Sequence, residues 1–538
     1  MESTMMHYPL TLVHLLERAG RYFSKVEIVS RRADRSLHRE TYGDFYRRAR
    51  ALAEALTRAG LKRGERVATL MWNHYAHLEA YFGAPVAGAV LHPLNLRLHV
   101  DDIAYIANHA EDRFLIVDDV LLPLVEQFKS RTGFERVFVV PISGEPVARG
   151  YESYEDLLAS ARGEFRYPEL DEYEAAGMCY TSGTTGRPRG VVYSHRSTVL
   201  HAYNAAMPNA MCFRQGAAVL PVVPMFHANA WGMPYAATLS GAKQVFPGPH
   251  LDAESLLDLM EREQVVLSAG VPTVWLAILQ AIEREPARWK LADGIELIVG
   301  GSAVPEALIR SFDRYGVSVV QAWGMTETSP LASIARLKRD IAGLSEDERY
   351  EIRAKQGYPL PFVEARVMVE NQEVRADGKT MGELQVRGPY VTASYYNHPV
   401  GAEKFTPDGW LRTGDVVVTD AGGYIKITDR TKDLIKSGGE WISSVDLENA
   451  IMGHPAVAEA AVIAIPHPRW DERPLAVVVL KPGARATGEE ISKFLEGKFA
   501  KWWLPDDYAF VDEIPRTSTG KFLKSKLRED FSSRNRAG

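Results

Sequence analysis

Apolar residues follow two different patterns along the chain, and the change between them divides the sequence. From about residue 40 to 330, helical stretches alternate with short apolar runs of the length of a buried strand, at 66–71, 114–118, 137–141, 219–224, 265–272 and 295–300. Strands separated by helices predict layered α/β structure. After about residue 357, runs of alternating polarity at 363–369 and 382–388 are separated by Gly, Pro and Asp turns, which predicts a β-rich subdomain.

A further compact unit is predicted beyond Asp429. Its expected elements are a Gly-Gly turn, a helix that opens at Ser443 with Asp446 in the capping-box position, strands at 460–466 and 475–480, and a helix at 489–499. A tail of about 110 residues is long enough to form a domain. We therefore expect an α/β fold with a large N-terminal domain, residues 1–429, that includes the β-rich subdomain, followed by a small, mobile α+β C-terminal domain, residues 430–538.

Composition and charge exclude several classes of protein. With 538 residues the chain exceeds the size of one core, and its 46% hydrophobic and 25% charged residues are typical of a globular protein. The formal net charge of -6 gives no basic footprint, so we expect no nucleic-acid partner. Cys179 and Cys212 have no metal-ligand spacing and form no disulfide framework, which favours a reducing, cytoplasmic location.

The N-terminus lacks a signal-peptide pattern, and no apolar run reaches the roughly 18 residues that cross a bilayer.

The segment 178–190, MCYTSGTTGRPRG, has the residues that a triphosphate needs. It lies between an apolar strand and a second strand at 191–193, and it offers glycine backbone N–H groups, short hydroxyl side chains and two arginines. It is not a Walker A loop, because no Gly-Lys-Ser/Thr run closes it after Gly183. The alternative is a surface turn rich in Ser, Thr and Gly.

This segment resembles the phosphate-binding loop of the acyl-adenylate-forming superfamily, which includes acyl-CoA synthetases, adenylation domains of peptide synthetases and firefly-type luciferases. Further motifs agree in order and spacing: PVVPMFHANAW at 221–231, QAWGMTETSP at 321–330, WLRTGDV at 410–416, YIKITDRTKDLIKSGGEWISS at 424–444 and PRTSTGKFLK at 515–524. The likeness covers nearly the whole chain and is strongest toward bacterial long-chain fatty acyl-CoA synthetases. It implies an AMP-forming ligase: ATP and a carboxylate give acyl-AMP and pyrophosphate, and the thiol of coenzyme A then gives acyl-CoA and AMP.

Three residues are expected to carry the adenylation chemistry. Thr184 and Glu327 offer the hard oxygen ligands that Mg2+ prefers, and the resemblance implies that they flank this metal. A lone glutamate would otherwise be a solvated loop acid. Because a carboxylate and a triphosphate about 4 Å apart repel by about 4 kcal/mol at an effective dielectric near 20, a cation must lie between them. The resemblance assigns this role to Lys521, the alternative being one more lysine of a basic tail, in which we expect Lys524 and Lys526 to be solvated.

The nucleotide is expected to contact side chains from four motifs. Asp415 can accept both ribose hydroxyls and Arg430 can donate to the ribose or a phosphate, although alone they would be a turn former and a surface ion pair. Trp323 replaces the tyrosine common in the family and can stack on adenine or pack in the core. Arg189 replaces a common lysine, which keeps the charge but changes the contact geometry. The other expected contacts of ATP and AMP are Thr181, Ser182, Gly183, Thr185, Gly186, Gly301, Gln321, Ala322, Gly324, Thr326, Lys432 and Lys436.

The resemblance also implies a second arrangement, reached when the small domain swings about a hinge at Asp429. Gly438 and Gly439 would then let the pantetheine arm of coenzyme A pass close to the backbone. His227 and Trp231 are expected to border the acyl tunnel, although such aromatic clusters are more often core. The resemblance implies that Trp441 moves as nucleotide binds.

Alternative functions stay open at this stage. The acid can be short, medium-chain, methylthio-substituted or aromatic instead of a long fatty acid. An adenylation domain that loads a carrier protein is weakened because no carrier segment follows residue 538, and a noncatalytic acyl or nucleotide binder is weakened by the presence of Lys521, Glu327 and Asp415. A luciferase-like oxygenase shares the first step and is not favoured by the fatty-acyl motifs. Relatives suggest a homodimer built through the N-terminal segments.

Overall fold

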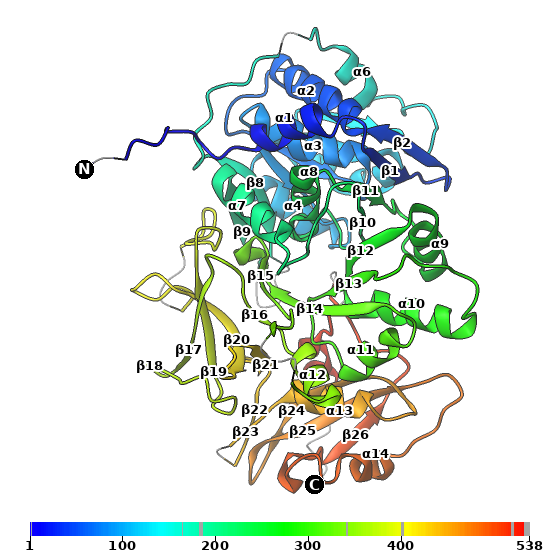
Figure 1. The fold of residues 1–538 in the computed structure, drawn as a ribbon, viewed down its shortest axis with the longest axis vertical. Helices are drawn as coiled ribbons and strands as arrows, with labels where there is room; N and C mark the ends of the chain where they lie inside the picture. The colour runs from blue at the N-terminus through cyan, green and yellow to red at the C-terminus, as the bar shows by residue number, and fades with distance from the viewer. Residues whose placement is uncertain are drawn as a thin grey trace.

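Four β-sheets and the helices that cover them make up the computed structural model, which describes residues 1, 3–163, 165–181, 187–339, 343–399, 403–438, 440–517 and 521–531 (Figure 1). Within these ranges the two largest sheets belong to the N-terminal part of the chain. A β-rich sheet lies beside them, and a fourth sheet with its helices forms a separate layer that includes the C-terminal segment. The predicted α/β class is therefore confirmed, with a large N-terminal and a small C-terminal unit.

The first sheet has seven strands in the described part of the chain, in the order β7-β6-β5-β3-β4-β8-β9, and all pairs except β8–β9 are parallel. The strands are β3 (Arg66–Leu70), β4 (Val90–Pro93), β5 (Asp112–Asp118), β6 (Arg136–Val140), β7 (Glu152–Ser153), β8 (Ala175–Tyr180) and β9 (Gly190–Ser194). The accompanying helices are α2 (Tyr42–Arg58), α3 (Tyr75–Val86), α4 (Val100–His109), α5 (Leu122–Val125) and α6 (Tyr154–Ala159). β8 and β9 are the two strands that the sequence predicts on either side of the phosphate-binding segment.

The second sheet joins distant parts of the chain in the order β16-β15-β14-β13-β12-β10-β11-β1-β2. Its strands are β1 (Glu27–Arg31), β2 (Leu37–Thr41), β10 (Ala218–Pro221), β11 (Lys243–Phe246), β12 (Val265–Gly270), β13 (Glu296–Val299), β14 (Ser318–Gly324), β15 (Leu331–Ile334) and β16 (Tyr358–Pro359). Its helices are α1 (Leu12–Tyr22), α7 (His195–Ala206), α8 (Met233–Ser240), α9 (Ala253–Glu263), α10 (Pro272–Arg284) and α11 (Glu306–Asp313), with α12 (Glu346–Arg353) before β16. Because β12, β13 and β14 are parallel, their carboxyl ends meet at one edge, where α/β proteins place ligands.

The β-rich subdomain is an antiparallel sheet of order β18-β17-β19-β20-β21. Its strands are β17 (Glu364–Val369), β18 (Gln372–Glu373), β19 (Gly382–Arg387), β20 (Leu411–Thr419) and β21 (Ile425–Arg430). Alternating side chains of β17 and β19 supply Val367, Leu384 and Val386 to a buried cluster that Trp323 of β14 joins. This packing brings the middle of β20 to the end of β14, where Trp323 Nε1 lies 2.8 Å from Asp415 Oδ2.

The C-terminal unit has the elements that the sequence predicts beyond Asp429. Its strands are β22 (Ile435–Ser437), β23 (Glu440–Ile442), β24 (Val457–His467), β25 (Asp471–Leu480) and β26 (Asp507–Phe510), and its helices are α13 (Ser444–Met452), α14 (Gly488–Leu495) and α15 (Lys524–Phe531). Ser443 caps α13 by accepting a hydrogen bond from Asp446 N, at 3.0 Å. The expected helix to residue 499 stops at Leu495, because Glu496 is extended and Gly497 adopts a φ of 79°. The domain boundary after residue 429 and the mobility of this unit stay predictions.

Lys524 corrects one expectation, because it is buried and paired rather than solvated. Its Nζ donates to Ser444 Oγ at 2.6 Å and lies 2.7 Å from Glu448 Oε1, and the two charged side chains are only 11% and 10% exposed. Lys526 is exposed, as expected, and pairs with Glu529 and Asp530. The buried ammonium fastens the start of α15 to α13, so the segment just after Lys521 is fixed to the body of the small unit. No helix in the described ranges is both long and apolar enough to cross a membrane.

We predict that Lys524→Met lowers the free energy of unfolding of the small unit by about 3–5 kcal/mol, because it leaves the buried Glu448 carboxylate without its cation. The matched control, Lys526→Met, removes an exposed lysine from the same helix and should cost less than about 0.5 kcal/mol. Urea unfolding followed by tryptophan fluorescence measures both. Equal stability of the two variants would contradict the buried pair.

Candidate active site

Two adjoining cavities lie where the second sheet, the β-rich subdomain and the C-terminal unit meet. The first, called here the large cavity, has a volume of about 640 Å³, and the second, called the basic cavity, has about 450 Å³. The lining of both includes Gly301, Ala322, Trp323, Gly324, Arg430 and Lys521. The shared residues form a junction at the carboxyl ends of β13 and β14.

Glycine at this junction lets three parts of the chain approach closely. A Cβ atom on Gly300 would lie 2.8 Å from Ala322 O and 3.1 Å from the Trp231 ring, so a larger residue would push β14 or this indole aside. Gly301 has a φ of 89°, and a Cβ there would lie 3.7 Å from Lys521 Cε. The turn therefore brings the Lys521 side chain against the backbone of the large domain.

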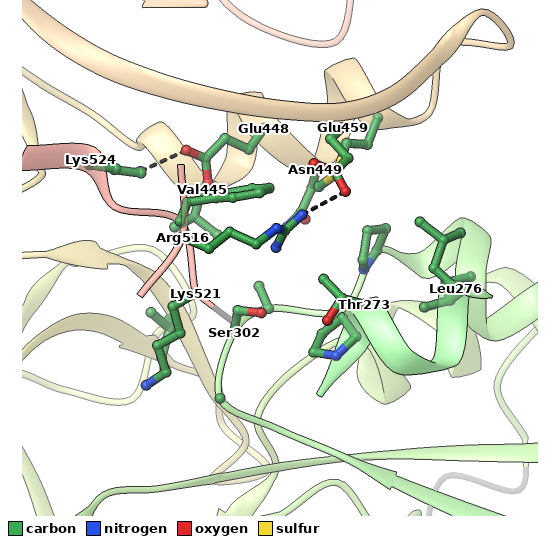
Figure 2. A pocket seen from close by; sticks show the side chains of 18 of the residues that line it. Thr273, Leu276, Ser302, Val445, Glu448, Asn449, Glu459, Arg516, Lys521 and Lys524 are labelled. Carbon is green, nitrogen blue, oxygen red and sulfur yellow. Dashed lines mark hydrogen bonds and ion pairs between the residues drawn. The ribbon is translucent and has the colours of Figure 1, made fainter. Parts of the chain in front are cut away.

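Lys521 occupies the junction with its backbone held locally. Its N–H donates to Thr517 Oγ1 at 3.2 Å, and its carbonyl accepts from Thr517 N at 2.8 Å. In Figure 2 its side chain lies on the Ser302 side of the cavity and its ammonium points away from the Glu448–Lys524 pair. Burial, with help from the nearby Arg430 and Lys432, lowers the pKa of Lys521 to about 8, although Asp415 and Glu327 oppose this shift. An anion that binds beside Lys521 would therefore stabilise its ammonium form.

Asp415 and Trp323 form a buried hydrogen bond on the wall of the large cavity. Trp323 Nε1 donates to Asp415 Oδ2 at 2.8 Å, and the two residues are 8% and 4% exposed. The β20–β21 register sets Asp415 opposite Arg430, whose Nε lies 3.3 Å from Asp415 Oδ1. An aromatic wall beside an acceptor carboxylate suits a nucleoside, with the base on the ring and the ribose hydroxyls on Asp415.

Glu327 is buried in the short 3-10 helix η4 (Thr326–Thr328) and faces the basic cavity. Tyr395 OH donates to Glu327 Oε1 at 2.7 Å, and Arg189 lies over the Tyr395 ring at 5.3 Å. A single held carboxylate fits Mg2+, which usually takes one or two carboxylates and completes its shell with waters and phosphate oxygens. Among the described residues, no group of three or more His, Cys, Asp or Glu could hold a metal ion alone.

The basic cavity has both cationic and apolar lining residues. Its cationic lining is Arg97, Arg187, Arg189, Lys404, Arg430 and Lys521, and Glu327 is the one carboxylate among its described lining residues. Its apolar lining includes Val222, Phe226, Trp231, Val271 and Val274. Such a surface suits an amphipathic anion with phosphate groups close by.

The segment that carries His227 and Trp231 has an unusual backbone. Ala228, Asn229, Ala230 and Trp231 have φ values of 44°, 54°, 46° and 56°, a left-handed run in which each such residue costs roughly 1–2 kcal/mol. Burial, with Lys521 and Arg97, lowers the pKa of His227 to about 4, so this ring is neutral at physiological pH. Strain of this kind gathers at ligand sites, and it supports a binding role for the segment over plain core packing.

Comparison with known proteins agrees with this geometry. The model of the family described as AMP-binding enzyme matches residues 15–396, and that of the AMP-binding enzyme C-terminal domain matches residues 446–521. The chain belongs to the AMP-binding enzyme family. It is 52% identical to a long-chain-fatty-acid–CoA ligase of Thermus thermophilus, over 99% of this chain and 97% of that one. It is 43% identical to a 3-methylmercaptopropionyl-CoA ligase of Ruegeria pomeroyi, over 99% of both chains.

Solved structures show the same architecture. The crystal structure of the anthranilate CoA ligase AuaEII in complex with anthranoyl-AMP superposes with a TM-score of 0.86 at 25% identity, covering 97% of this chain and 98% of that one. Within its family the enzyme is therefore an AMP-forming acid–CoA ligase, and the predicted family, fold and class of enzyme are confirmed.

Most described residues that the sequence nominates lie at the two cavities. Those that line them are Thr181, Arg189, His227, Trp231, Gly301, Ala322, Trp323, Gly324, Thr326, Glu327, Asp415, Arg430, Lys432 and Lys521. Ser182, Gly183, Thr184, Thr185, Gly186 and Gly439 lie outside the described residues. Their roles, and those of the lining residues, stay predictions.

Four nominated residues are not among those that line the cavities. Gln321 is fully buried, and its amide bonds internally to Val304, Ala354 and Gln356. Its backbone carbonyl accepts from Ala335 N at 2.8 Å, so both groups are already bonded within the protein. Lys436, Gly438 and Trp441 lie on the β22–β23 hairpin of the small unit. Their predicted roles would need another arrangement of this unit.

The basic-cavity residues that sequence reasoning did not nominate include Arg97, Arg187, Tyr395, His398 and Lys404. Arg187 could have been predicted, because it belongs to the phosphate-binding segment. The other four residues lie outside the motifs. Tyr395 matters most, because it holds Glu327.

We predict that acyl-AMP formation loses kcat/KM above pH 8, about tenfold per pH unit, because the required ammonium of Lys521, with a pKa of about 8, deprotonates. Pyrophosphate exchange without coenzyme A is the assay, since the thiol titrates in the same range. Lys521→Arg stays charged and should be slow but without this alkaline decline. A flat wild-type profile from pH 7 to about 10, or the same decline in both proteins, would contradict the assignment.

Proposed function

We propose that the enzyme activates a fatty acid. The observation that carries this proposal is the position of Lys521, where a cavity with an aromatic ring and an acceptor carboxylate meets a cavity with cationic and apolar walls. ATP would place its adenosine along Trp323 and Asp415, and the acid would place its chain along the apolar lining residues of the basic cavity. The two reacting groups then meet at the junction.

In the first step a carboxylate oxygen of the acid attacks the α-phosphorus of ATP. The new bond joins that oxygen to phosphorus, the bond to the β-phosphate oxygen breaks, and pyrophosphate leaves. Lys521 offsets the repulsion between the two anions, and Arg187 and Arg189 hold the departing phosphates. Such placed charges and the alignment of the two substrates supply most of the catalysis in phosphoryl chemistry.

Magnesium is proposed as the metal of this step, with Glu327 and Thr184 as its protein ligands. When bound, Mg2+ neutralises phosphate charge. The Tyr395 hydroxyl supports this role because its hydrogen bond fixes the orientation of the Glu327 carboxylate and leaves the second oxygen for a ligand.

In the second step the thiol of coenzyme A attacks the acyl carbonyl, the carbon–oxygen bond to AMP breaks, and the thiol proton leaves with solvent. We propose that the small unit rotates about Asp429 for this step and presents Gly438, Gly439, Lys436 and Trp441. Asp429 is 1% exposed and accepts from Ser444 N and Arg430 N, each at 2.7 Å, so it ties β21 to α13 at the connection between the units. The position of the hairpin outside both cavities supports a role after rotation.

For the acyl group, a long or medium fatty acid is favoured. The apolar lining of the basic cavity and the higher identity to a long-chain-fatty-acid–CoA ligase support it. A methylthio acid is the second candidate, because a 3-methylmercaptopropionyl-CoA ligase is 43% identical over the whole chain. A cytoplasmic location stays a prediction. A homodimer also stays a prediction, and sedimentation of the protein as a stable monomer would exclude it.

The test is acid-dependent exchange of labelled pyrophosphate into ATP without coenzyme A, across straight-chain acids of about 4 to 18 carbons, methylthiopropionate and benzoate. Each buried methylene contributes about 0.8 kcal/mol, so four carbons in a fitting tunnel separate substrates by roughly a hundredfold. Exchange should peak with fatty acids. A peak with methylthiopropionate or benzoate would overturn the substrate, and no exchange with any acid would overturn the proposed function.

Lys521→Ala distinguishes the two steps. It should abolish exchange, because the cation is lost, and spare acyl transfer from supplied acyl-AMP to coenzyme A. Equal loss of both half-reactions would contradict the role given to Lys521.

A further inference from the structure

We propose that Trp323 is a positioning residue for ribose recognition: its indole N–H fixes the carboxylate of Asp415 in the orientation that accepts the ribose hydroxyls of ATP. This inference rests on the proposed function for the identity of the nucleotide. It gives Trp323 a role beyond that of a ring against the base.

The hydrogen bond is buried and joins two distant strands. Trp323 ends β14 and Asp415 lies on β20, yet Nε1 and Oδ2 are 2.8 Å apart. A hydrogen bond to a charged acceptor contributes more than one between neutral groups, and burial excludes the water that would compete for the carboxylate.

The donor is rigid because the indole is packed on its other side. Trp323 belongs to a buried cluster with Ala332, Val363 and Leu384, which leaves the N–H no freedom to turn. Core packing was the alternative to a binding role for Trp323. Here the packing supports the binding role, because it fixes the direction of the indole N–H. The N–H direction is set by the β-rich subdomain, before any ligand arrives.

The other partners of Asp415 cannot replace this donor. Arg430 Nε is 3.3 Å from Oδ1, and its side chain is 44% exposed, so water and salt weaken this contact. The Asp415 backbone N–H donates to Thr413 Oγ1 at 3.1 Å, which holds the main chain but not the carboxylate.

The carboxylate keeps acceptor capacity for a ligand. Two oxygens provide about four lone-pair directions. Within the described part of the chain, Trp323 contacts Oδ2 and Arg430 contacts Oδ1. Asp415 lines the large cavity, so the remaining directions are available to the 2′ and 3′ hydroxyls. Binding then avoids the entropy cost of orienting a free carboxylate.

The test compares ATP with 2′-deoxy-ATP. Trp323→Phe keeps an aromatic ring but removes the N–H, and it should reduce the preference for ATP in kcat/KM of the exchange reaction roughly tenfold. The loss should appear in KM more than in kcat, because the ribose is bound throughout the reaction. Asp415→Asn should reduce the preference as well, and the double variant should lose little more than Asp415→Asn alone.

Trp275→Phe is the matched control. Trp275 is fully buried on α10, and its indole N–H has no hydrogen-bond partner among the described residues. Its replacement should change the preference less than about twofold, so any general effect of losing an indole is measured directly.

Three results would overturn the proposal: an unchanged preference in Trp323→Phe, an effect equal to that of Trp275→Phe, or additive effects of Trp323→Phe and Asp415→Asn. If Trp323→Phe does not fold, 3-benzothienylalanine at position 323 preserves the shape without the N–H and gives the same comparison. Calorimetric binding of ATP and 2′-deoxy-ATP reads the preference without turnover. A wild-type protein that binds ATP but exchanges no pyrophosphate would contradict the proposed reaction, but not the proposed role of Trp323.

Discussion

The repulsion between a carboxylate and a triphosphate is the constraint on which this structure depends. The carboxylate and the triphosphate must come into contact, so a cation has to lie beside both without filling the space that they occupy. In the proposed reaction Lys521 is this cation, and it reaches the site from the small unit, against Gly301 of the large one. Burial lowers the pKa of Lys521 to about 8, because it disfavours the charged ammonium. In the proposed reaction the two anionic substrates would stabilise this charge at the place where the chemistry occurs.

The two acceptor carboxylates near Lys521 are each held by an aromatic donor. Trp323 holds Asp415 and Tyr395 holds Glu327, through hydrogen bonds of 2.8 and 2.7 Å. A free carboxylate beside phosphates would turn toward the nearest cation, and Arg430, Arg189 and Lys521 are all close by. Trp323 and Tyr395, packed in the fold, each fix one carboxylate oxygen, although Asp415 Oδ1 also lies 3.3 Å from Arg430 Nε. In the proposed function the remaining acceptor directions serve ribose and metal. The β-rich subdomain supplies Asp415 on β20. The segment that follows β19 supplies Tyr395, which holds Glu327.

Much of this arrangement could be predicted from the sequence, because the motifs lie at strand ends that the hydrophobic pattern locates. Partnerships between distant residues could not. Nothing near Lys524 shows that Glu448 and Ser444 surround it, so its burial was missed, and Tyr395 belongs to no chemical pattern. Gln321 was nominated by its motif, but its amide is consumed by Gln356, Val304 and Ala354. Sequence locates segments, whereas side-chain direction depends on packing across the sheets.

We infer that the two cavities hold the two halves of one acyl-adenylate, with Lys521 at their junction. Calorimetry with a stable mimic, decanoyl sulfamoyl-adenosine, tests it against decanoate and adenosine sulfamate separately. If the cavities are joined as described, the mimic binds about a hundredfold or more tighter than either half, because the second half binds intramolecularly. Binding of the mimic no tighter than adenosine sulfamate would contradict the claim.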